Sequence, residues 1–165
     1  MRHLNYQSIA KQVMKQISDK GAFLVVKAGK LNVMTIGWAL IGFVWRKPMM
    51  MIVVRDSRYT FEIIEKADSF SVNVPSKNMD KELEFCGTKS GRNIDKFKEC
   101  NLKTLKAQKI TSPILDIPGV HYECKIVYKT KMEPKFLTKE YEYLYPNKDY
   151  HTMYFGEILG CYQTN

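Results

Sequence analysis

The sequence predicts a mainly β fold: a closed or nearly closed antiparallel barrel with a few short helices packed outside it. Runs of β-branched and aromatic residues are separated by glycines and prolines, which is typical of strands and turns. These runs do not alternate regularly with helical segments, as a doubly wound parallel sheet would require. With 165 residues, 45% of them hydrophobic and 12% aromatic, the chain is expected to form a single domain over residues 1–165.

The N-terminal part is expected to form a helix and then a hairpin. Residues 1–20 carry apolar side chains at helical spacing, at Ile9, Val13 and Ile17. This spacing predicts a short amphipathic lead-in helix. From Gly21 the pattern changes to β-branched and aromatic residues, and the turn at Gly29 predicts two strands that follow one another.

The middle of the chain combines a strand, a loop and a helix. The apolar run 49–54 is continuous, which predicts a strand covered on both faces and placed near the middle of the sheet. Residues 55–60 form a polar loop that leads into a short helix, and the hydroxyl of Ser57 or Thr60 is available to cap it. Residues 69–74 alternate apolar and polar side chains, so we expect a half-buried strand that the following proline ends.

The second half is expected to place two short helices before two long strands. Helical segments are expected at 78–85 and 93–100, on either side of a turn-rich stretch at 86–92. The strands are expected at 120–131 and 150–159. No internal repeat or low-complexity segment interrupts this order.

Several classes of protein are excluded by what the sequence lacks. No apolar run reaches the roughly 18 residues of a membrane-spanning helix, so no membrane partner is expected. Residues 1–20 lack the apolar core and the cleavage site of a signal peptide, and we therefore expect a cytoplasmic protein. No Rossmann glycine motif or P-loop occurs, and the histidines and cysteines show no metal-ligand spacing, so no metal site is expected.

The cysteines are expected to be reduced thiols in this compartment. They are spread along the chain without CxxC spacing, at Cys86, Cys100, Cys124 and Cys161. Cys86 lies beside a basic loop, where it could be mistaken for a redox centre. Because no resolving partner is close to it in the sequence, we expect a structural role.

The net charge of +9 indicates an anionic partner, and most of the excess lies in the first half of the chain. Two basic loops rich in hydroxyls could bind a phosphate, one of them at a helix start and the other between glycines. Their polar residues are Arg55, Ser57, Arg58 and Thr60 in the first loop, and Lys89, Ser90 and Arg92 in the second. The alternative is two solvated loops, and the sequence does not show whether they converge. No aromatic RNA-binding signature accompanies the charge, so no nucleic-acid partner is expected.

Residues 32–38 could bind a flat heteroaromatic ligand. They combine an amide, a hydroxyl and a glycine with large apolar side chains, and such a ligand needs both apolar cover and hydrogen bonds to its edge. The alternative is that Met34 and Trp38 belong to the core and Gly37 marks a bulge. His151 is either a surface or packing histidine, or a donor beside a redox centre.

Several motifs follow one another in an order that is specific, although each motif alone is modest. They are Asn32-Val-Met-Thr-Ile-Gly-Trp38, Arg46-Lys-Pro48, Val54-Arg-Asp-Ser-Arg-Tyr-Thr60, Phe70-Ser-Val-Asn-Val-Pro75, Cys86-Gly-Thr-Lys-Ser-Gly-Arg-Asn-Ile-Asp-Lys-Phe97 and His151-Thr-Met-Tyr-Phe-Gly-Glu157. Their succession, from about Gly21 to Gly160, resembles the flavin-reductase-like family and specifically its flavoredoxin-type branch. The resemblance implies a split β-barrel that binds FMN noncovalently and forms a homodimer, with the flavin near the subunit interface.

The resemblance also implies roles for single residues. Residues 32–38 would lie against the isoalloxazine ring, with the backbone N–H groups of Met34, Thr35 and Ile36 at its polar edge. The residues implied for the whole cofactor are Asn32, Met34, Thr35, Ile36 and Trp38 at the ring, and Arg55, Ser57, Arg58, Thr60, Lys89, Ser90 and Arg92 around the phosphate. His151 is a weak candidate for a titrating group beside the flavin.

The function implied by the resemblance is that of an NAD(P)H:flavin oxidoreductase or a flavoredoxin-like electron carrier. The flavin would accept a hydride from NAD(P)H, as a transient substrate, or exchange single electrons with a redox protein. The alternative is a noncatalytic barrel module that holds FMN or binds another anion. The chain ends at Asn165, where many relatives continue, so we expect a more exposed flavin or an altered dimer edge.

Overall fold

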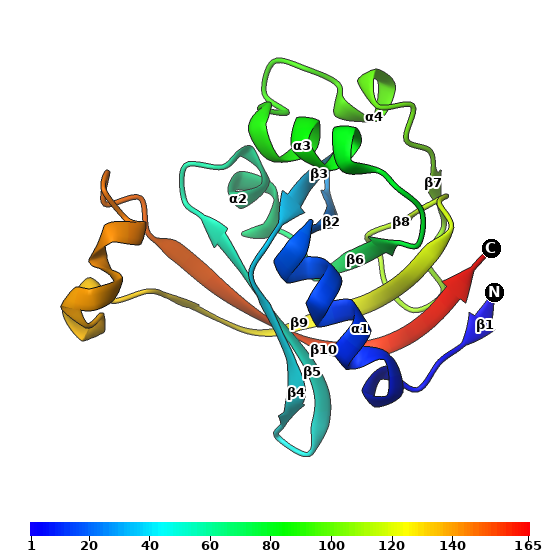
Figure 1. The fold of residues 1–165 in the computed structure, drawn as a ribbon, viewed down its shortest axis with the longest axis horizontal. Coiled ribbons are helices and arrows are strands. Elements are labelled where there is room, and N and C mark those ends of the chain that lie inside the picture. The colour runs from blue at the N-terminus through cyan, green and yellow to red at the C-terminus, as the bar shows by residue number, and fades with distance from the viewer.

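The chain, described over residues 1–165 by a computed structural model, is built mainly from strands, as the sequence predicts (Figure 1). The strands are β1 (Arg2–His3), β2 (Ala22–Ala28), β3 (Lys30–Ile36), β4 (Ala39–Val44), β5 (Lys47–Arg55), β6 (Ser69–Pro75), β7 (Thr104–Leu105), β8 (Ile114–Leu115), β9 (Gly119–Lys131) and β10 (His151–Thr164). The helices are α1 (Tyr6–Asp19), α2 (Tyr59–Ile64), α3 (Asp80–Thr88) and α4 (Lys96–Glu99), with two 3-10 helices, η1 (Pro134–Phe136) and η2 (Lys139–Leu144).

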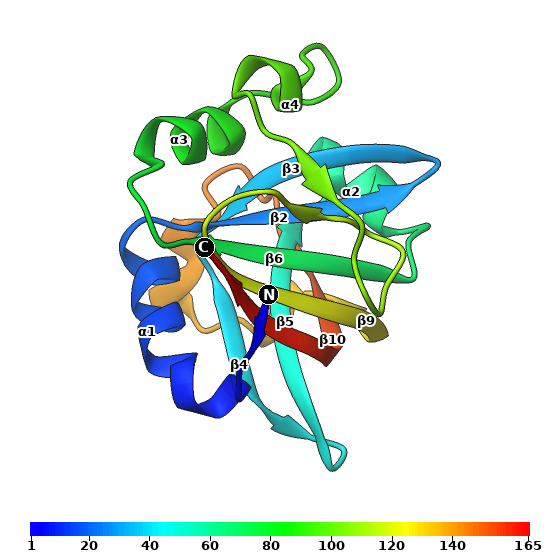
Figure 2. The ribbon, with the colours of Figure 1, turned by 90° about the vertical axis from the view of Figure 1, so that its right-hand side faces the viewer.

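A single antiparallel sheet forms the body of the molecule. Its strands lie in the order β3-β2-β6-β9-β10-β5-β4, and β1 pairs with β10. The two edge strands, β3 and β4, are consecutive in the chain and are joined by Gly37 and Trp38. Because β3 also touches β5, the sheet curls back on itself and leaves a split between these two strands. Figure 2 shows the curled sheet with α1 beside it and α3 and α4 above β2 and β3.

Two apolar clusters cover the two faces of β2. Leu24 and Val26 belong to the larger cluster, which includes buried residues of α1 and α2. Phe23 and Val25 belong to the smaller cluster, which includes buried residues of α3. A strand covered on both faces needs apolar side chains at every position, which explains the continuous apolar run of β2.

The run 49–54 lies inside the sheet, as predicted. The prediction that both of its faces are buried is only partly correct. β5 lies inside the sheet, between β10 and β4. Met50, Ile52 and Val54 are fully buried on one face, whereas Met51 and Val53 on the other face remain partly exposed. One face of β5 is therefore not fully covered.

The expected half-buried strand at 69–74 is buried on both faces as β6. Its polar side chains are satisfied by the segment around β8, which lies over them. Ser71 Oγ donates to Pro113 O at 2.6 Å, and Asn73 Oδ1 accepts from Leu115 N at 2.9 Å. Alternation of polar and apolar residues predicts one exposed face, but these hydrogen bonds allow the polar face to be buried.

The ends of the chain are more regular than the sequence indicates. The lead-in helix begins after Asn5, whose side chain accepts a hydrogen bond from Gln7 N at 2.9 Å, and it buries Val13 and Ile17. The last strand continues to Thr164 instead of ending at residue 159. It does so because β10 pairs with the long strand β9 as far as Gly119 and with β1 on its other side.

Residues 132–150 form an arm that projects from the barrel and carries η1 and η2 (Figure 1). Arg55 anchors the arm, because its guanidinium donates to Asp149 O at 2.7 Å and to Leu144 O at 3.1 Å. No helix is expected in this segment from the sequence. Among the helices of the molecule, none has the length and the apolar character that crossing a membrane requires.

Candidate functional site

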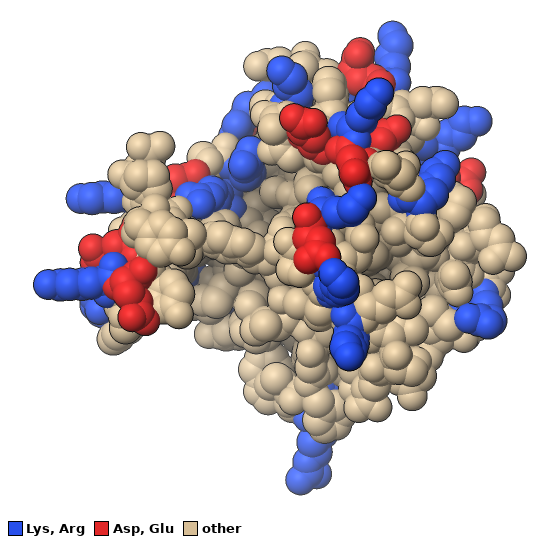
Figure 3. Space-filling model, in the orientation of Figure 1, with Lys and Arg blue, Asp and Glu red and all other residues tan.

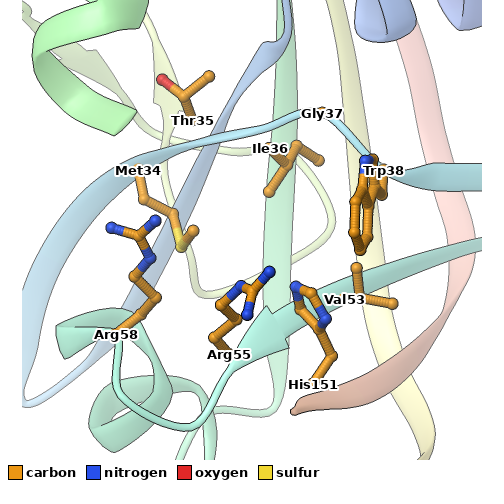
Figure 4. A pocket seen from close by; sticks show the side chains of 9 residues that line it. All are labelled: Met34, Thr35, Ile36, Gly37, Trp38, Val53, Arg55, Arg58 and His151. Carbon is orange, nitrogen blue, oxygen red and sulfur yellow. The ribbon is translucent and has the colours of Figure 1, made fainter. Parts of the chain in front are cut away.

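Two adjoining pockets lie beside the split of the barrel. We call the first the split pocket; its lining residues, shown in Figure 4, are Met34, Thr35, Ile36, Gly37, Trp38, Val53, Arg55, Arg58 and His151. We call the second the basic pocket; its lining residues are Asn32, Met34, Ser57, Arg58, Tyr59, Thr60, Cys86, Gly87, Thr88, Lys89, Ser90, Gly91, Arg92 and Lys96. Met34 and Arg58 line both pockets, which therefore adjoin.

The split pocket is formed by the edge strand β3, by β5 and by the start of β10. Because β3 pairs only with β2, alternate backbone N–H and C=O groups on its other side have no strand partner. At the far end, the rings of Trp38 and His151 lie 5.0 Å apart at an angle of 48°. Trp38 is 44% exposed, so it covers the pocket without belonging to the core. The pocket thus combines a flat apolar wall with backbone hydrogen-bonding groups.

His151 is held in the split pocket by the arm. Its Nδ1 lies 2.8 Å from Tyr145 Oη, and the Tyr145 ring lies 5.0 Å from the guanidinium carbon of Arg55. Burial, together with the positive charge of Arg55, lowers the pKa of His151 to about 4. The imidazole is therefore neutral at pH 7, where it can donate or accept a hydrogen bond but carries no charge.

The basic pocket lies between α2 and the loop that follows α3. Arg58 Nη1 donates to Gly87 O at 3.2 Å, and neither Arg58 nor Lys89 forms an ion pair. Arg92 is shared, because it pairs with Glu62 and also donates to Ser57 O at 3.1 Å. The charges of Arg58 and Lys89 consequently remain available to an anion in the pocket.

The floor of the basic pocket is polar and tightly packed. Asn32 Nδ2 donates to Thr60 Oγ1 at 2.8 Å, and both side chains are buried. A Cβ atom at Gly91 would overlap the Asn32 amide and would lie 2.9 Å from the Tyr59 ring. Only glycine therefore lets this loop approach the floor so closely.

Lys96 is a pocket residue that the sequence analysis did not single out. It is 4% exposed, and its Nζ donates to Val33 O at 2.9 Å and to Cys86 O at 2.8 Å. Burial lowers the pKa of Lys96. An ammonium group has three N–H donors, and these two contacts use only two of them. The sequence could have indicated Lys96 as a site residue, because it lies within the motif Cys86 to Phe97 on which the family resemblance rests.

Every residue that the sequence analysis proposed for the site lines one of the two pockets. The split pocket contains Met34, Thr35, Ile36, Trp38, Arg55, Arg58 and His151, and the basic pocket contains Asn32, Met34, Ser57, Arg58, Thr60, Lys89, Ser90 and Arg92. The two basic loops, far apart in the sequence, thus meet in one pocket. This convergence was left open by the sequence alone.

Several of these side chains are already engaged with protein groups. Thr35 Oγ1 donates to Leu83 O at 2.6 Å and points away from the split pocket (Figure 4). Ser57 Oγ donates to Asp149 Oδ2 at 2.6 Å, and Arg55 is bound to the arm. The prediction that Ser57 or Thr60 caps the helix is wrong: Arg58 occupies the N-cap position and no side chain caps α2.

The donor set of the site fits a flat ring that carries a phosphate. Two guanidinium groups, a free ammonium at Lys89 and hydroxyls are the groups that bind a phosphate monoester, and they occupy the basic pocket. The open edge of β3 and the Trp38 ring suit a planar ligand with polar atoms along one side.

Comparison with known proteins identifies the family of this chain. The family model described as "Flavin reductase like domain" matches residues 14–165. An uncharacterized protein of Archaeoglobus fulgidus is 28% identical over 130 residues, which are 79% of this chain and 64% of that protein. The chain thus spans slightly less than two thirds of that relative.

Solved structures agree with the family. A flavoredoxin from Methanosarcina acetivorans has a TM-score of 0.68 and 27% identity, covering 88% of this chain and 69% of that chain. An FMN-binding protein from Thermus thermophilus with bound 1-cyclohex-2-enone has a TM-score of 0.68 and 18% identity, covering 87% of this chain and 69% of that chain. The latter similarity concerns the fold alone.

Proposed function

The chain belongs to the flavin reductase like family, and from this premise we propose that it is a flavoprotein that binds FMN noncovalently in the two adjoining pockets. The observation that carries the proposal is that the two pockets adjoin and share Met34 and Arg58. A pocket suited to a ring thus lies next to a pocket suited to a phosphate. FMN is a ligand that carries both groups on one molecule.

In this proposal, the protein binds and orients the cofactor from both ends. The N–H groups on the open edge of β3 would bind the polar edge of the ring, and Trp38 and Met34 would cover it. Arg58, Lys89 and Arg92 would bind the phosphate, assisted by Ser90 and by the hydroxyl of Thr60. Ser57 would contribute only if it exchanged its hydrogen bond to Asp149.

We further propose that the protein acts as an NAD(P)H:flavin oxidoreductase or as a flavoredoxin-like electron carrier. When bound, the flavin supplies hydride acceptance or single-electron exchange. The chain supplies positive charge from Arg55, Arg58 and Lys96, which favours negative charge on a bound ligand. His151, neutral at pH 7, would act as a hydrogen-bonding group and not as a general acid.

Anaerobic titration distinguishes these activities. The protein is reconstituted with FMN and titrated with NADH, NADPH and a reduced ferredoxin while flavin absorption is recorded. Bleaching by a nicotinamide nucleotide supports the reductase, and bleaching by ferredoxin alone supports the carrier. A bound flavin that none of them reduces would favour the noncatalytic FMN-holding module, and a protein that binds no flavin would refute the proposal.

We also propose that the protein is a homodimer in the cytoplasm, with the β4–β5 hairpin in the interface. Phe43 and Trp45 on this hairpin are 63% and 58% exposed. The turn of the hairpin carries Arg46 and Lys47, and Figure 3 shows basic side chains at its tip, whereas acidic and basic groups are mixed over the upper part of that face. Trp45 also packs against Phe155, with ring centroids 6.0 Å apart. Exposed aromatic patches of this kind are typical of protein interfaces.

The uncovered face of β5 supports the same interface. Met51 lies opposite Phe155 and Leu40 in neighbouring strands, and Leu40 is 61% exposed. A second copy on this surface would complete the two-sided burial that the apolar run 49–54 predicts. Val53, on the same face, lines the split pocket, so the second copy would also border the proposed flavin site.

A further inference from the structure

Two cysteines meet at the base of the loop that lines the basic pocket. Cys86 lies in the last turns of α3, and Cys100 directly follows α4. They are 14 positions apart in the sequence, but their sulfur atoms are 4.0 Å apart. Cys86 has no cysteine near it in the sequence, but the fold brings the Cys100 sulfur beside it.

The segment between the two cysteines carries half of the basic pocket. Lys89, Ser90, Gly91 and Arg92 all lie within it and line that pocket. Cys86 lines the pocket as well, and its carbonyl oxygen accepts a hydrogen bond from Lys96 Nζ at 2.8 Å. A bond between the two sulfur atoms would therefore close this loop at its base.

The two thiols differ in access to solvent. Cys86 is 1% exposed, whereas Cys100 is partly exposed. Cys100 is thus the more accessible of the two to an external reagent. A disulfide requires a sulfur separation of about 2.05 Å, so the side chains must rotate toward each other. The other two cysteines, Cys124 and Cys161, are buried in β9 and β10, away from this loop.

We propose that Cys86 and Cys100 are a reversible dithiol–disulfide site whose oxidation restrains the phosphate-binding loop and slows the release of FMN. The effect on FMN rests on the proposed function; the formation of the disulfide does not. The oxidant is a low-molecular-weight disulfide. The Cys100 thiolate attacks it and releases one thiolate, and the Cys86 thiolate then attacks the Cys100 sulfur and releases the second. The two protons lost by the protein thiols are taken up by the two released thiolates.

The surroundings of the pair determine how fast this exchange proceeds. Burial raises the pKa of Cys86 to about 12 and also raises that of Cys100. The neighbouring charged groups are Lys96, which lowers both pKa values, Glu82, which raises both, and Glu99, which raises that of Cys100. Since the thiolate is the attacking species, exchange is expected to be slow at pH 7 and faster at pH 8.5.

The test uses the full chain, reduced or treated with oxidised glutathione, a linear disulfide, at pH 8.5. After the remaining thiols are alkylated, peptide mass spectrometry is expected to find Cys86 linked to Cys100, and Cys124 and Cys161 alkylated after unfolding. FMN release, followed by flavin fluorescence, is expected to be about fivefold slower in the oxidised protein, because a restrained loop loses less freedom on binding. Cys100→Ser is expected to abolish both effects, and the matched variant Cys124→Ser is expected to leave both unchanged.

Two outcomes would overturn the proposal. One is the absence of a Cys86–Cys100 link, or preferential linkage of another pair. The other is a quantitative link with FMN release unchanged within twofold. If the protein binds no FMN, hydrogen exchange of residues 89–95 replaces the release rate: slower exchange after oxidation supports the restrained loop, and equal exchange refutes it. Failure of the proposed function is thereby distinguished from failure of the dithiol site.

Discussion

Replacing Arg58 by alanine tests whether the basic pocket binds a phosphate. Arg58 lines both pockets and forms no ion pair, so its charge is available to a ligand. Its one hydrogen bond to the protein is to Gly87 O, at 3.2 Å. FMN and riboflavin share the ring system and differ by the phosphate. If Arg58 binds that phosphate, Arg58→Ala should lower the affinity for FMN far more than the affinity for riboflavin.

The expected magnitude follows from the type of contact. A hydrogen bond to a charged group contributes about 1.5–3 kcal/mol, which corresponds to a rise of about ten- to a hundredfold in the Kd for FMN. Removing the hydrogen bond to Gly87 O also loosens the loop that carries Lys89 and Arg92, and this too weakens FMN more than riboflavin. The ratio of the two Kd values therefore measures phosphate binding by Arg58 together with the loop that it holds.

The assay is quenching of flavin fluorescence at equilibrium, with FMN and with riboflavin. Lys11→Ala serves as the control, because it removes the same charge from an exposed position in α1, far from the site. We expect this control to change neither Kd by more than about twofold, since surface charges at a distance are screened. Equal losses of FMN and riboflavin affinity in Arg58→Ala would refute the phosphate assignment.

Three further predictions concern Lys96, His121 and the β4–β5 hairpin. Lys96→Met should lower both FMN affinity and the midpoint of thermal unfolding, because it leaves two buried carbonyl oxygens without a donor at about 1–3 kcal/mol each; an unchanged Kd and midpoint would contradict this. Burial lowers the pKa of His121 to about 4, so between pH 6.5 and pH 4 the folded state binds fewer protons than the unfolded state. The free energy of unfolding should therefore fall by up to about 3 kcal/mol as the pH is lowered from above 6.5 to 4. Urea unfolding at both pH values should show this loss, and His121→Gln should reduce it. Phe43→Asp should convert a dimer to a monomer in light scattering, and a wild-type monomer would refute the proposed interface.

The strands β2, β3, β5, β6, β9 and β10 could be predicted from the sequence because each carries its own local pattern, whereas β1, β4, β7 and β8 were not expected. The burial of the predicted strands could not be read from the sequence. β2 and β6 are both covered on two faces, yet one reads as a continuous apolar run and the other as an alternating pattern. The difference lies in hydrogen bonds such as that from Ser71 to Pro113 O, which join residues 42 positions apart. A short stretch of sequence does not show that such a distant hydrogen-bond partner exists. Conversely, β5 carries a continuous apolar run although Met51 and Val53 on one of its faces remain partly exposed.

The site shows the same division between local and distant information. The sequence identified the basic residues of two loops because each loop is short and its composition is visible in one window. It could not show that Arg58 and Gly87 come within hydrogen-bonding distance, nor that Cys86 and Cys100 become neighbours. Both contacts depend on where α3 packs against the sheet. The net charge of +9 indicated an anion without a location; the packing of α3 gathers Arg58, Lys89 and Arg92 around one pocket, where a single phosphate would meet all three.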